Sequence, residues 1–179
     1  MKTKDVEKIL ITEEELAKRI RELGNRISED YKDKKILALG ILKGSVVFLA
    51  DLIRNINSEV SIDFMTVSSY GNSTETSGEL KIKKDLDTDI SGKDVLIVED
   101  IIDSGITLSK LKEELLKRNP SSLKICTLLN KPERRTAQVD VDYIGFDIPN
   151  EFIIGYGLDY AEKYRDLPFV GVLKREIYE

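Results

Sequence analysis

The segment from Val95 to Leu108, VLIVEDIIDSGITL, constrains the fold more than any other part of the chain. Its apolar run Val95–Val98 is typical of a buried parallel strand. Two acids, Glu99 and Asp100, follow this run, and a Gly-containing turn over 103–107 leads into a helical pattern. The segment therefore predicts a strand, a tight turn and a helix in direct succession.

This strand–turn–helix unit has the chemistry of an anion site. The first N–H groups of a helix have no partners within the helix, and the helix dipole favours negative charge there. Ser104 and Thr107 add hydroxyl donors, and Gly105 lets the backbone approach an anion closely. The acids just upstream suit a sugar diol or a hydrated Mg²⁺. One loop can therefore hold a phosphate together with its attached sugar.

The chain has no histidine and a single cysteine, which narrows the chemistry it can perform. Ser-His and Cys-His nucleophile pairs and histidine-ligated zinc are excluded, so proton transfer would rest on Asp, Glu, Lys or Tyr. Cys126 falls in an apolar run and is expected to be a small core residue. The candidate groups for proton chemistry are Glu99, Asp100, Asp103 and Asp159.

Length and charge favour one domain that binds neither nucleic acid nor a membrane. The 179 residues suffice for one substantial core, and the net charge of −5 is unlike that of a nucleic-acid-binding protein. No apolar run approaches the length of a membrane span, and the N-terminal MKTKDVEKIL lacks the apolar core of a signal peptide. We therefore expect a cytoplasmic protein.

Strand and helix patterns alternate along the chain. An amphipathic helix is predicted over Thr12–Tyr31, with Thr12 and Glu15 in a capping-box pattern. Further helices are predicted over 44–56 and after 107, and strands over 36–41, 60–67, 80–84, 95–98, 123–129, 142–146 and 169–173. This alternation predicts the α/β class, a parallel twisted sheet with helices on both faces. Loops that follow its strands should meet at one edge, where ligands bind in such sheets.

Five motifs resemble those of the bacterial hypoxanthine-guanine phosphoribosyltransferases, a type I phosphoribosyltransferase family. They cover nearly the whole chain in order: LKGS at 42–45, SSYG at 68–71, the 95–108 segment, LLNKPERR at 128–135 and EFIIGYGLDYAEKYRDLP at 151–168. The resemblance implies a Mg²⁺-dependent enzyme of purine salvage. Such an enzyme transfers phosphoribosyl from phosphoribosyl pyrophosphate (PRPP) to hypoxanthine and guanine, giving IMP or GMP and pyrophosphate. It also implies a single domain over 1–179, with a core at about 35–148 and a small hood from 1–11 and 149–179.

The resemblance assigns residues that would bind PRPP. Glu99 and Asp100 would face the ribose hydroxyls and Mg²⁺, and Asp103 would be the general base toward the purine N7. The 5′-phosphate would be held by Asp103, Ser104, Gly105, Ile106 and Thr107. Pyrophosphate would be held by Lys43, Gly44 and Arg165, and in the family the bond corresponding to Leu42–Lys43 is often cis. The lid would comprise Ser68, Ser69, Tyr70 and Gly71.

The resemblance also assigns residues to the purine. Lys131 would contact the exocyclic O6, Phe152 would stack on the base, and backbone groups of Ile153 would meet its edge. Asp159 would hold a second Mg²⁺, which makes Glu99, Asp100 and Asp159 the expected metal environment. The family forms dimers and tetramers, so a homodimer or homotetramer is expected.

Plain structural roles remain open for the same residues. Asp103 could cap a helix, and Ser45 could be the N-cap of an ordinary strand-to-helix loop. The polar segment 68–79 could be a surface loop, Phe152 a core residue and Lys131 a solvated lysine.

Other functions also remain open. An enzyme of this fold could use xanthine, adenine or orotate, although Lys131 argues against adenine. A regulator of this fold could sense PRPP and bind RNA. The net charge of −5 and the presence of Asp103 argue against this function. A Rossmann-type nucleotide-binding module is disfavoured because no GxGxxG follows any predicted strand.

Overall fold

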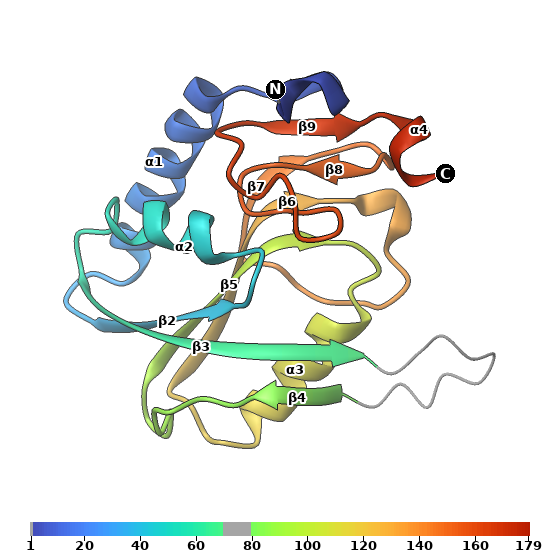
Figure 1. The fold of residues 1–179 in the computed structure, drawn as a ribbon. Helices are drawn as coiled ribbons and strands as arrows, with labels where there is room; N and C mark the ends of the chain where they lie inside the picture. The colour runs from blue at the N-terminus through green and yellow to red at the C-terminus, as the bar shows by residue number, and fades with distance from the viewer. Residues whose placement is uncertain (1, 70–79) are drawn as a thin grey trace.

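A computed structural model describes residues 2–69 and 80–179, which form two sheets flanked by helices (Figure 1). The larger sheet has six strands in the order β4-β3-β2-β5-β6-β7. They are β2 (Lys35–Ile41), β3 (Glu59–Ser69), β4 (Leu80–Lys84), β5 (Asp94–Ile102), β6 (Ser122–Asn130) and β7 (Tyr143–Asp147). All neighbouring strands pair in parallel except β4, which is antiparallel to β3. The predicted α/β class is therefore confirmed, with one antiparallel edge strand.

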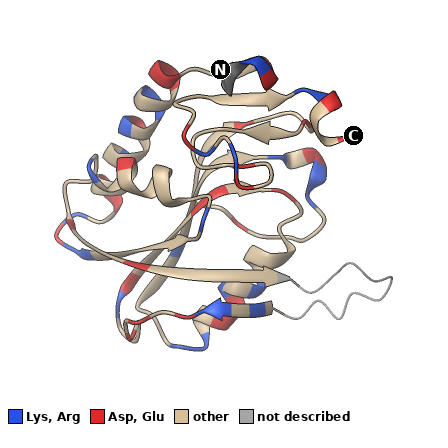
Figure 2. Cartoon of the chain, viewed as in Figure 1, with Lys and Arg blue, Asp and Glu red and all other residues tan. Residues whose placement is uncertain are grey.

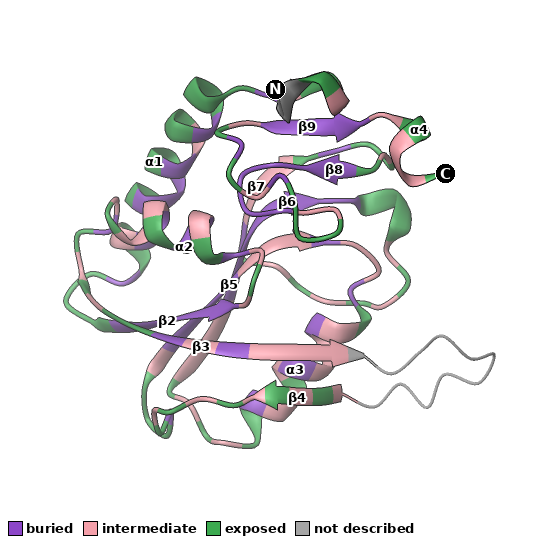
Figure 3. Cartoon of the chain, in the orientation of Figure 1, coloured by how far each residue is buried: buried purple, intermediate pink, exposed green. Residues whose placement is uncertain are grey.

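Helices cover both faces of this sheet. Helix α1 (Glu13–Asp30) and helix α2 (Val46–Ile53) pack on one face, and α3 (Ile106–Leu116) packs on the other. Alternation along the buried strands divides the core accordingly. Ala38 and Leu96 face α1 and α2, whereas Leu39 and Ile97 face α3. Figure 3 shows β2, β5 and β6 buried at the centre, as expected for strands covered on both sides.

The first long helix forms as its sequence predicts. The Thr12 side chain accepts from the Glu15 N–H at 3.2 Å, and the Glu15 carboxylate accepts from the Thr12 N–H at 2.8 Å. This confirms the capping box, which starts α1 at Glu13. Its apolar stripe Leu16, Ile20, Leu23 and Ile27 is buried.

The chain ends form a second, antiparallel sheet in the order β1-β9-β8. Its strands are β1 (Val6–Ile11), β8 (Ile153–Ile154) and β9 (Val170–Leu173). The 3₁₀ helix η1 (Lys2–Asp5) precedes it, and helix α4 (Arg175–Tyr178) follows it. Both termini thus lie on one side of the molecule (Figure 1). Strands β1, β8 and β9 come from the two stretches that were predicted to form the hood.

Three sequence expectations need correction. Strand β5 continues to Ile102, so Glu99 and Asp100 lie within the strand rather than after its end. Helix α3 begins at Ile106, which places Ile106 and Thr107 in its first turn and not in the preceding loop. Strand β8 lies within the stretch 149–165, for which the sequence predicted no strand. The apolar run in the sequence indicated the start of β5, but the strand extends beyond this run because Ile101 pairs with Leu129 of β6.

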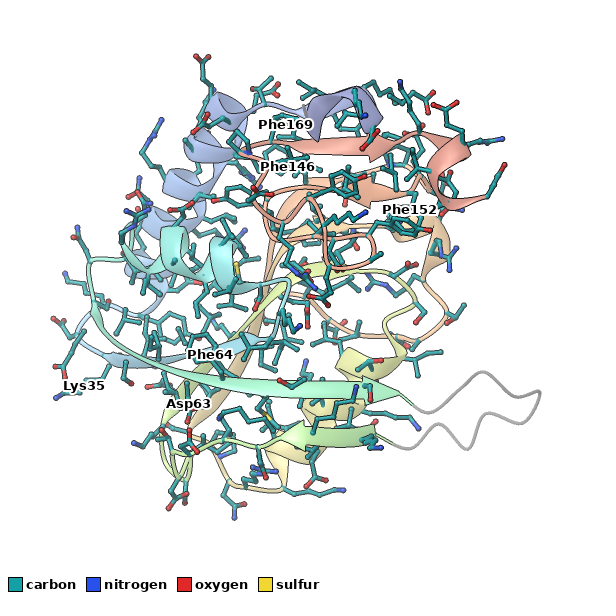
Figure 4. The ribbon with its side chains drawn as sticks, in the orientation of Figure 1. Lys35, Asp63, Phe64, Phe146, Phe152 and Phe169 are labelled. Carbon is teal, nitrogen blue, oxygen red and sulfur yellow. The ribbon has the colours of Figure 1, made fainter. Side chains whose placement is uncertain are left out.

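A buried carboxylate holds the connection between β4 and β5. Asp63 of β3 is only 5% exposed and accepts N–H groups of Phe64 at 2.7 Å, Asp87 at 3.0 Å and Thr88 at 2.8 Å (Figure 4). Burial raises the pKa of Asp63, but these hydrogen bonds outweigh it and hold the pKa below its usual value.

The single cysteine is a core residue, as predicted. Cys126 is fully buried in β6, and burial raises the pKa of its thiol. Among the described residues, no helix is long and apolar enough to cross a membrane. Figure 2 shows Lys and Arg interspersed with Asp and Glu over the described part of the chain.

Candidate active site

A cavity of about 240 Å³ opens where β2 and β5 end and α3 begins. Its lining residues are Ile41, Leu42, Val67, Glu99, Ile101, Ile102, Asp103, Ser104, Gly105, Thr107 and Leu108. Larger cavities, such as one of about 540 Å³ along α1 and α2, lie elsewhere. The smaller cavity is the candidate site because it joins the predicted base to the predicted anion loop. It lies at the carboxyl ends of parallel strands, where α/β sheets bind ligands.

The loop before α3 is shaped by a left-handed glycine. Gly105 is the helix N-cap with φ of 82°, a conformation that glycine adopts readily. A Cβ at this position would lie 2.8 Å from Cδ of Arg135. The N–H groups of Thr136 and Ala137 both donate to the Ser104 carbonyl at 3.0 Å. The loop is therefore held from outside by residues 135–137, which leaves the first turn of α3 to face the cavity.

Asp103 does not cap α3, so the capping interpretation of this residue is wrong. The N-cap makes no side-chain hydrogen bond, and the Asp103 carboxylate instead pairs with Nε of Arg134 at 2.6 Å. Both side chains are about half exposed, at 44% for Asp103 and 50% for Arg134. The carboxylate thus lies at the open side of the cavity, where an incoming molecule can reach it.

Two adjacent acids, Glu99 and Asp100, come from the end of β5. Burial raises the pKa of Glu99 well above its usual value, and the neighbouring Asp100 charge adds to this. Burial also raises the pKa of Asp100, although the Ile101 N–H donates to it at 2.8 Å and Arg165 lies near enough to oppose the shift. A bound cation or sugar diol would stabilise the ionised form of this pair.

The loop from Leu42 to Ser45 lies against these acids. Its Leu42–Lys43 peptide bond is cis, as the resemblance implied. A Cβ on Gly44 would overlap the Asp100 carboxylate, so only glycine allows this approach. Ser45 is the N-cap of α2 but makes no capping bond, because its hydroxyl donates to the Ile41 carbonyl at 2.6 Å.

Acids of a neighbouring loop hold the two cations predicted for pyrophosphate. Lys43 Nζ pairs with Glu162 at 3.0 Å. Arg165 pairs with Asp159 at 2.9 Å and donates to the Gly157 carbonyl at 2.8 Å. The structure therefore brings Lys43, Arg165 and Asp159 into one network beside Asp100. Sequence reasoning missed Glu162, because an acid in a charged surface loop has no pattern that sets it apart.

Of the predicted purine residues, Lys131 lies near Asp103 and contacts the residue that precedes Phe152. Lys131 is only 8% exposed, so the solvated-lysine interpretation is wrong, and its Nζ donates to the Glu151 carbonyl at 2.8 Å. Burial lowers the pKa of Lys131, and the Asp103 charge opposes this shift. Phe152 is 37% exposed rather than a core residue, whereas Ile153 is buried in β8 opposite Val172.

Sequence reasoning also missed the residues that support the segment around Asp103 and Lys131. Asn130 donates to Asp147 at 2.6 Å and accepts from Arg135, whose Nε reaches the Asp103 carbonyl at 3.4 Å. The motif LLNKPERR contains Asn130, Arg134 and Arg135, but spacing alone does not show which arginine turns toward Asp103.

The predicted lid lies partly within the described residues. Ser68 and Ser69 end β3 and pair with Lys81 and Leu80 of β4. Tyr70 and Gly71 lie outside the described residues.

The described acids do not assemble a metal cage from protein groups alone. No group of three or more His, Cys, Asp and Glu residues within 2–69 and 80–179 is arranged to hold a metal ion. Glu99 and Asp100 are adjacent, whereas Asp159 is paired with Arg165 and accepts the Glu162 N–H at 2.8 Å. The three residues expected in the metal environment are thus divided between two groups.

A mostly parallel six-stranded sheet, together with a small antiparallel sheet from the chain ends, places this fold in the type I phosphoribosyltransferase class. The model of the phosphoribosyl transferase domain family matches residues 6–161. The chain is 55% identical to the hypoxanthine-guanine phosphoribosyltransferase of Bacillus subtilis, over 98% of this chain and 97% of the relative. The chain belongs to the hypoxanthine-guanine phosphoribosyltransferase family.

Solved structures agree with this assignment. A hypoxanthine phosphoribosyltransferase from Staphylococcus aureus superposes with a TM-score of 0.95 at 49% identity, covering 98% of this chain and 96% of that one. A hypoxanthine-guanine phosphoribosyltransferase from Bacillus anthracis, with HEPES in its active site, has a TM-score of 0.91 at 51% identity. That match covers 94% of this chain and 99% of the Bacillus anthracis chain.

Proposed function

We propose that this enzyme of purine salvage transfers 5-phosphoribosyl from PRPP to hypoxanthine and guanine, giving IMP or GMP and pyrophosphate. The observation that carries the proposal is the 240 Å³ cavity, which joins the Asp103 carboxylate to the N-terminus of α3. A phosphate at that N-terminus and a purine at Asp103 would lie on opposite sides of one ribose.

The α3 loop holds the 5′-phosphate in this proposal. Ser104, Gly105 and Thr107 line the cavity, and the backbone N–H groups of 104–107 with the hydroxyls of Ser104 and Thr107 would donate to the phosphate. Glu99 and Asp100 accept hydrogen bonds from the ribose hydroxyls. Burial raises the pKa of both acids, and donor hydrogen bonds from a sugar diol would favour their ionised forms, which supports this assignment.

Asp103 is the general base. As the purine nitrogen bonds to C1 of the sugar and pyrophosphate leaves, the N7 proton passes to the Asp103 carboxylate. Lys131 donates to O6 of the purine, and its ammonium stabilises the negative charge that the base develops. Phe152 stacks on the ring, and the backbone at Ile153 contacts the base edge. The partial exposure of Asp103 and Phe152 allows a base to reach both.

Lys43, Gly44 and Arg165 bind the leaving pyrophosphate. Two observations support this assignment. Both cations already hold carboxylates, which are oxyanions that pyrophosphate can replace. Gly44 lies against Asp100, so the loop and the ribose-binding acids form one surface.

The donor set fits Mg²⁺ that arrives with PRPP. Mg²⁺ is usually bound by one or two carboxylates together with waters and substrate phosphates, which matches a pair of acids without a full cage. We assign the metal environment to Glu99 and Asp100, with Asp159 near a second ion. When bound, Mg²⁺ neutralises the charge of the pyrophosphate group.

Four further features complete the proposal. The segment 68–71 closes over PRPP as a lid, and 1–11 with 149–179 serves as the hood of a single 1–179 domain. The enzyme is a homodimer or homotetramer in the cytoplasm and has no nucleic-acid or membrane partner. Sedimentation tests the oligomeric state, and cell fractionation tests the cytoplasmic location.

The deciding experiment is a purine panel with PRPP and Mg²⁺, followed by pyrophosphate release. We expect turnover with hypoxanthine and guanine and none with adenine, because Lys131 cannot accept a hydrogen bond from an amino group. Preferential turnover of xanthine would change the substrate assignment. Absence of turnover with every 6-oxopurine, together with salt-dependent retention of RNA, would replace the enzyme by a regulator.

A further inference from the structure

Phe152 belongs to a cluster of three aromatic rings contributed by distant parts of the chain. Tyr178, in the C-terminal helix α4, stacks on Phe152 with ring centroids 4.8 Å apart and an interplanar angle of 24°. Tyr160 meets it edge-on, with centroids 5.5 Å apart and an angle of 87°. These are the two arrangements that aromatic rings prefer. Figure 4 places Phe152 on the side of the molecule where the chain ends.

The backbone around Phe152 is held as firmly as its ring. The Leu173 N–H donates to the Phe152 carbonyl at 2.9 Å, and Lys131 donates to the preceding carbonyl of Glu151 at 2.8 Å. Lys174 is the N-cap of helix α4, and its N–H donates to the Asp5 carbonyl at 3.0 Å. The short helix that carries Tyr178 therefore begins next to Leu173, the residue that is hydrogen-bonded to Phe152.

Stacking by Tyr178 leaves Phe152 in an unusual state for an exposed side chain. Phe152 is still 37% exposed, yet one face of its ring is covered by a parallel ring. A free phenylalanine at this exposure would change rotamer easily. The contacts with Tyr178 and Tyr160 restrict that freedom, and a ring that is ordered in advance binds a partner with a smaller entropic cost.

We propose that Tyr178 is a positioning residue for the purine. It supports the covered face of Phe152, so that the open part of the ring is presented to the base. The proposal rests on the proposed function, in which Phe152 stacks on a 6-oxopurine. Tyr178 is not among the residues that line the cavity assigned to PRPP, so we expect its contribution to be confined to the base half of the site.

The test compares three variants with the wild type. Tyr178→Ala is expected to raise the KM for hypoxanthine about three- to tenfold, the range of an aromatic pair, while the KM for PRPP stays within about twofold. Tyr178→Phe keeps the ring and should behave as wild type. Ile177→Ala is the matched control, because Ile177 packs on the hood core but is not one of the rings that contact Phe152.

Direct binding separates positioning from loss of structure. By titration calorimetry, Tyr178→Ala should weaken IMP binding by a similar factor and leave binding of ribose 5-phosphate, which lacks a base, unchanged. Should Tyr178→Ala fail to fold, Tyr178→Leu retains apolar volume without a ring and is measured instead.

The outcomes distinguish this inference from the proposed function. If the wild type turns over hypoxanthine but Tyr178→Ala leaves its KM unchanged, or raises both KM values equally, the inference is wrong. An equal effect from Ile177→Ala would also overturn it, because the change would then come from the hood as a whole. A wild type that neither turns over a 6-oxopurine nor binds IMP would refute the proposed function itself.

Discussion

Replacing Asp103 by asparagine separates catalysis from stability in this protein. The amide has nearly the same size as the carboxylate but cannot accept the N7 proton. We expect turnover to fall about 100-fold or more, which corresponds to about 2.7 kcal/mol of barrier. The fold should be retained, because Asp103 does not cap α3 and the loop is held by backbone hydrogen bonds to Ser104.

The stability cost of this substitution follows from the one ion pair that it breaks. Asp103 and Arg134 are 44% and 50% exposed, so solvent screens the pair and its loss costs no more than about 1 kcal/mol. For a chain of this length, that shifts the midpoint of thermal unfolding by about 2–4 °C. The predicted loss of rate is therefore much larger than any loss of folded protein.

Arg134→Gln is the matched control for Asp103→Asn. It breaks the same ion pair and leaves the base in place, so the unfolding midpoint should shift similarly while turnover stays within about fivefold of wild type. Turnover is measured by pyrophosphate release at saturating PRPP and Mg²⁺. Near wild-type turnover of Asp103→Asn, or an equal loss in Arg134→Gln, would refute the assignment of Asp103 as the base.

Three further predictions follow from buried contacts. Asp63→Asn should lower the free energy of unfolding by about 2–3 kcal/mol at pH 7, because an amide cannot accept all three N–H groups. Because the pKa of Asp63 is lowered in the folded state, its contribution to stability is complete above about pH 4 and is lost as the pH falls further. Urea unfolding measured at several pH values should therefore show a smaller loss of stability below about pH 4 in the variant than in the wild type. Gly44→Ala should reduce kcat/KM for PRPP at least tenfold, because its Cβ would overlap Asp100. In Gly92→Ala the Cβ meets no heavy atom within 4 Å but the φ of 71° is strained for alanine, so this variant should lose some stability and keep kcat/KM near wild type. Lys131→Met should lower kcat/KM for hypoxanthine about 10- to 100-fold, and an unchanged value would exclude the O6 contact.

Local patterns in the sequence were enough to predict the class of fold. The capping box at Thr12, the apolar strand at Val95–Val98 and the alternation of strands with helices each depend on neighbouring residues. Such preferences act within a few residues, so they can be read without knowing the rest of the structure. For Gly105 the sequence predicted a place in a turn that approaches an anion closely, and the structure adds that its backbone is left-handed.

Family motifs predicted which residues meet at the site, but not how they are paired. The motifs named Lys43, Arg165 and Asp159, whereas the structure adds Glu162, whose carboxylate pairs with both cations and whose N–H donates to Asp159. The sequence allowed Asp103 to be a base or a cap, and the structure shows that Gly105 is the N-cap and that the Asp103 carboxylate pairs with Arg134. Contacts between residues so far apart in sequence depend on the packing of loops, which local patterns do not encode.

The order of residues alone determined that a strand, an anion loop and a helix follow one another, because each is stabilised by contacts within a short stretch of chain. Tertiary structure decided how far β5 extends, how deeply Lys131 is buried and which ring stacks on Phe152. These three features depend on strands β6 and β8 and on the C-terminal helix. Their partners lie far away along the chain, so their burial and contacts exist only once the sheets have assembled.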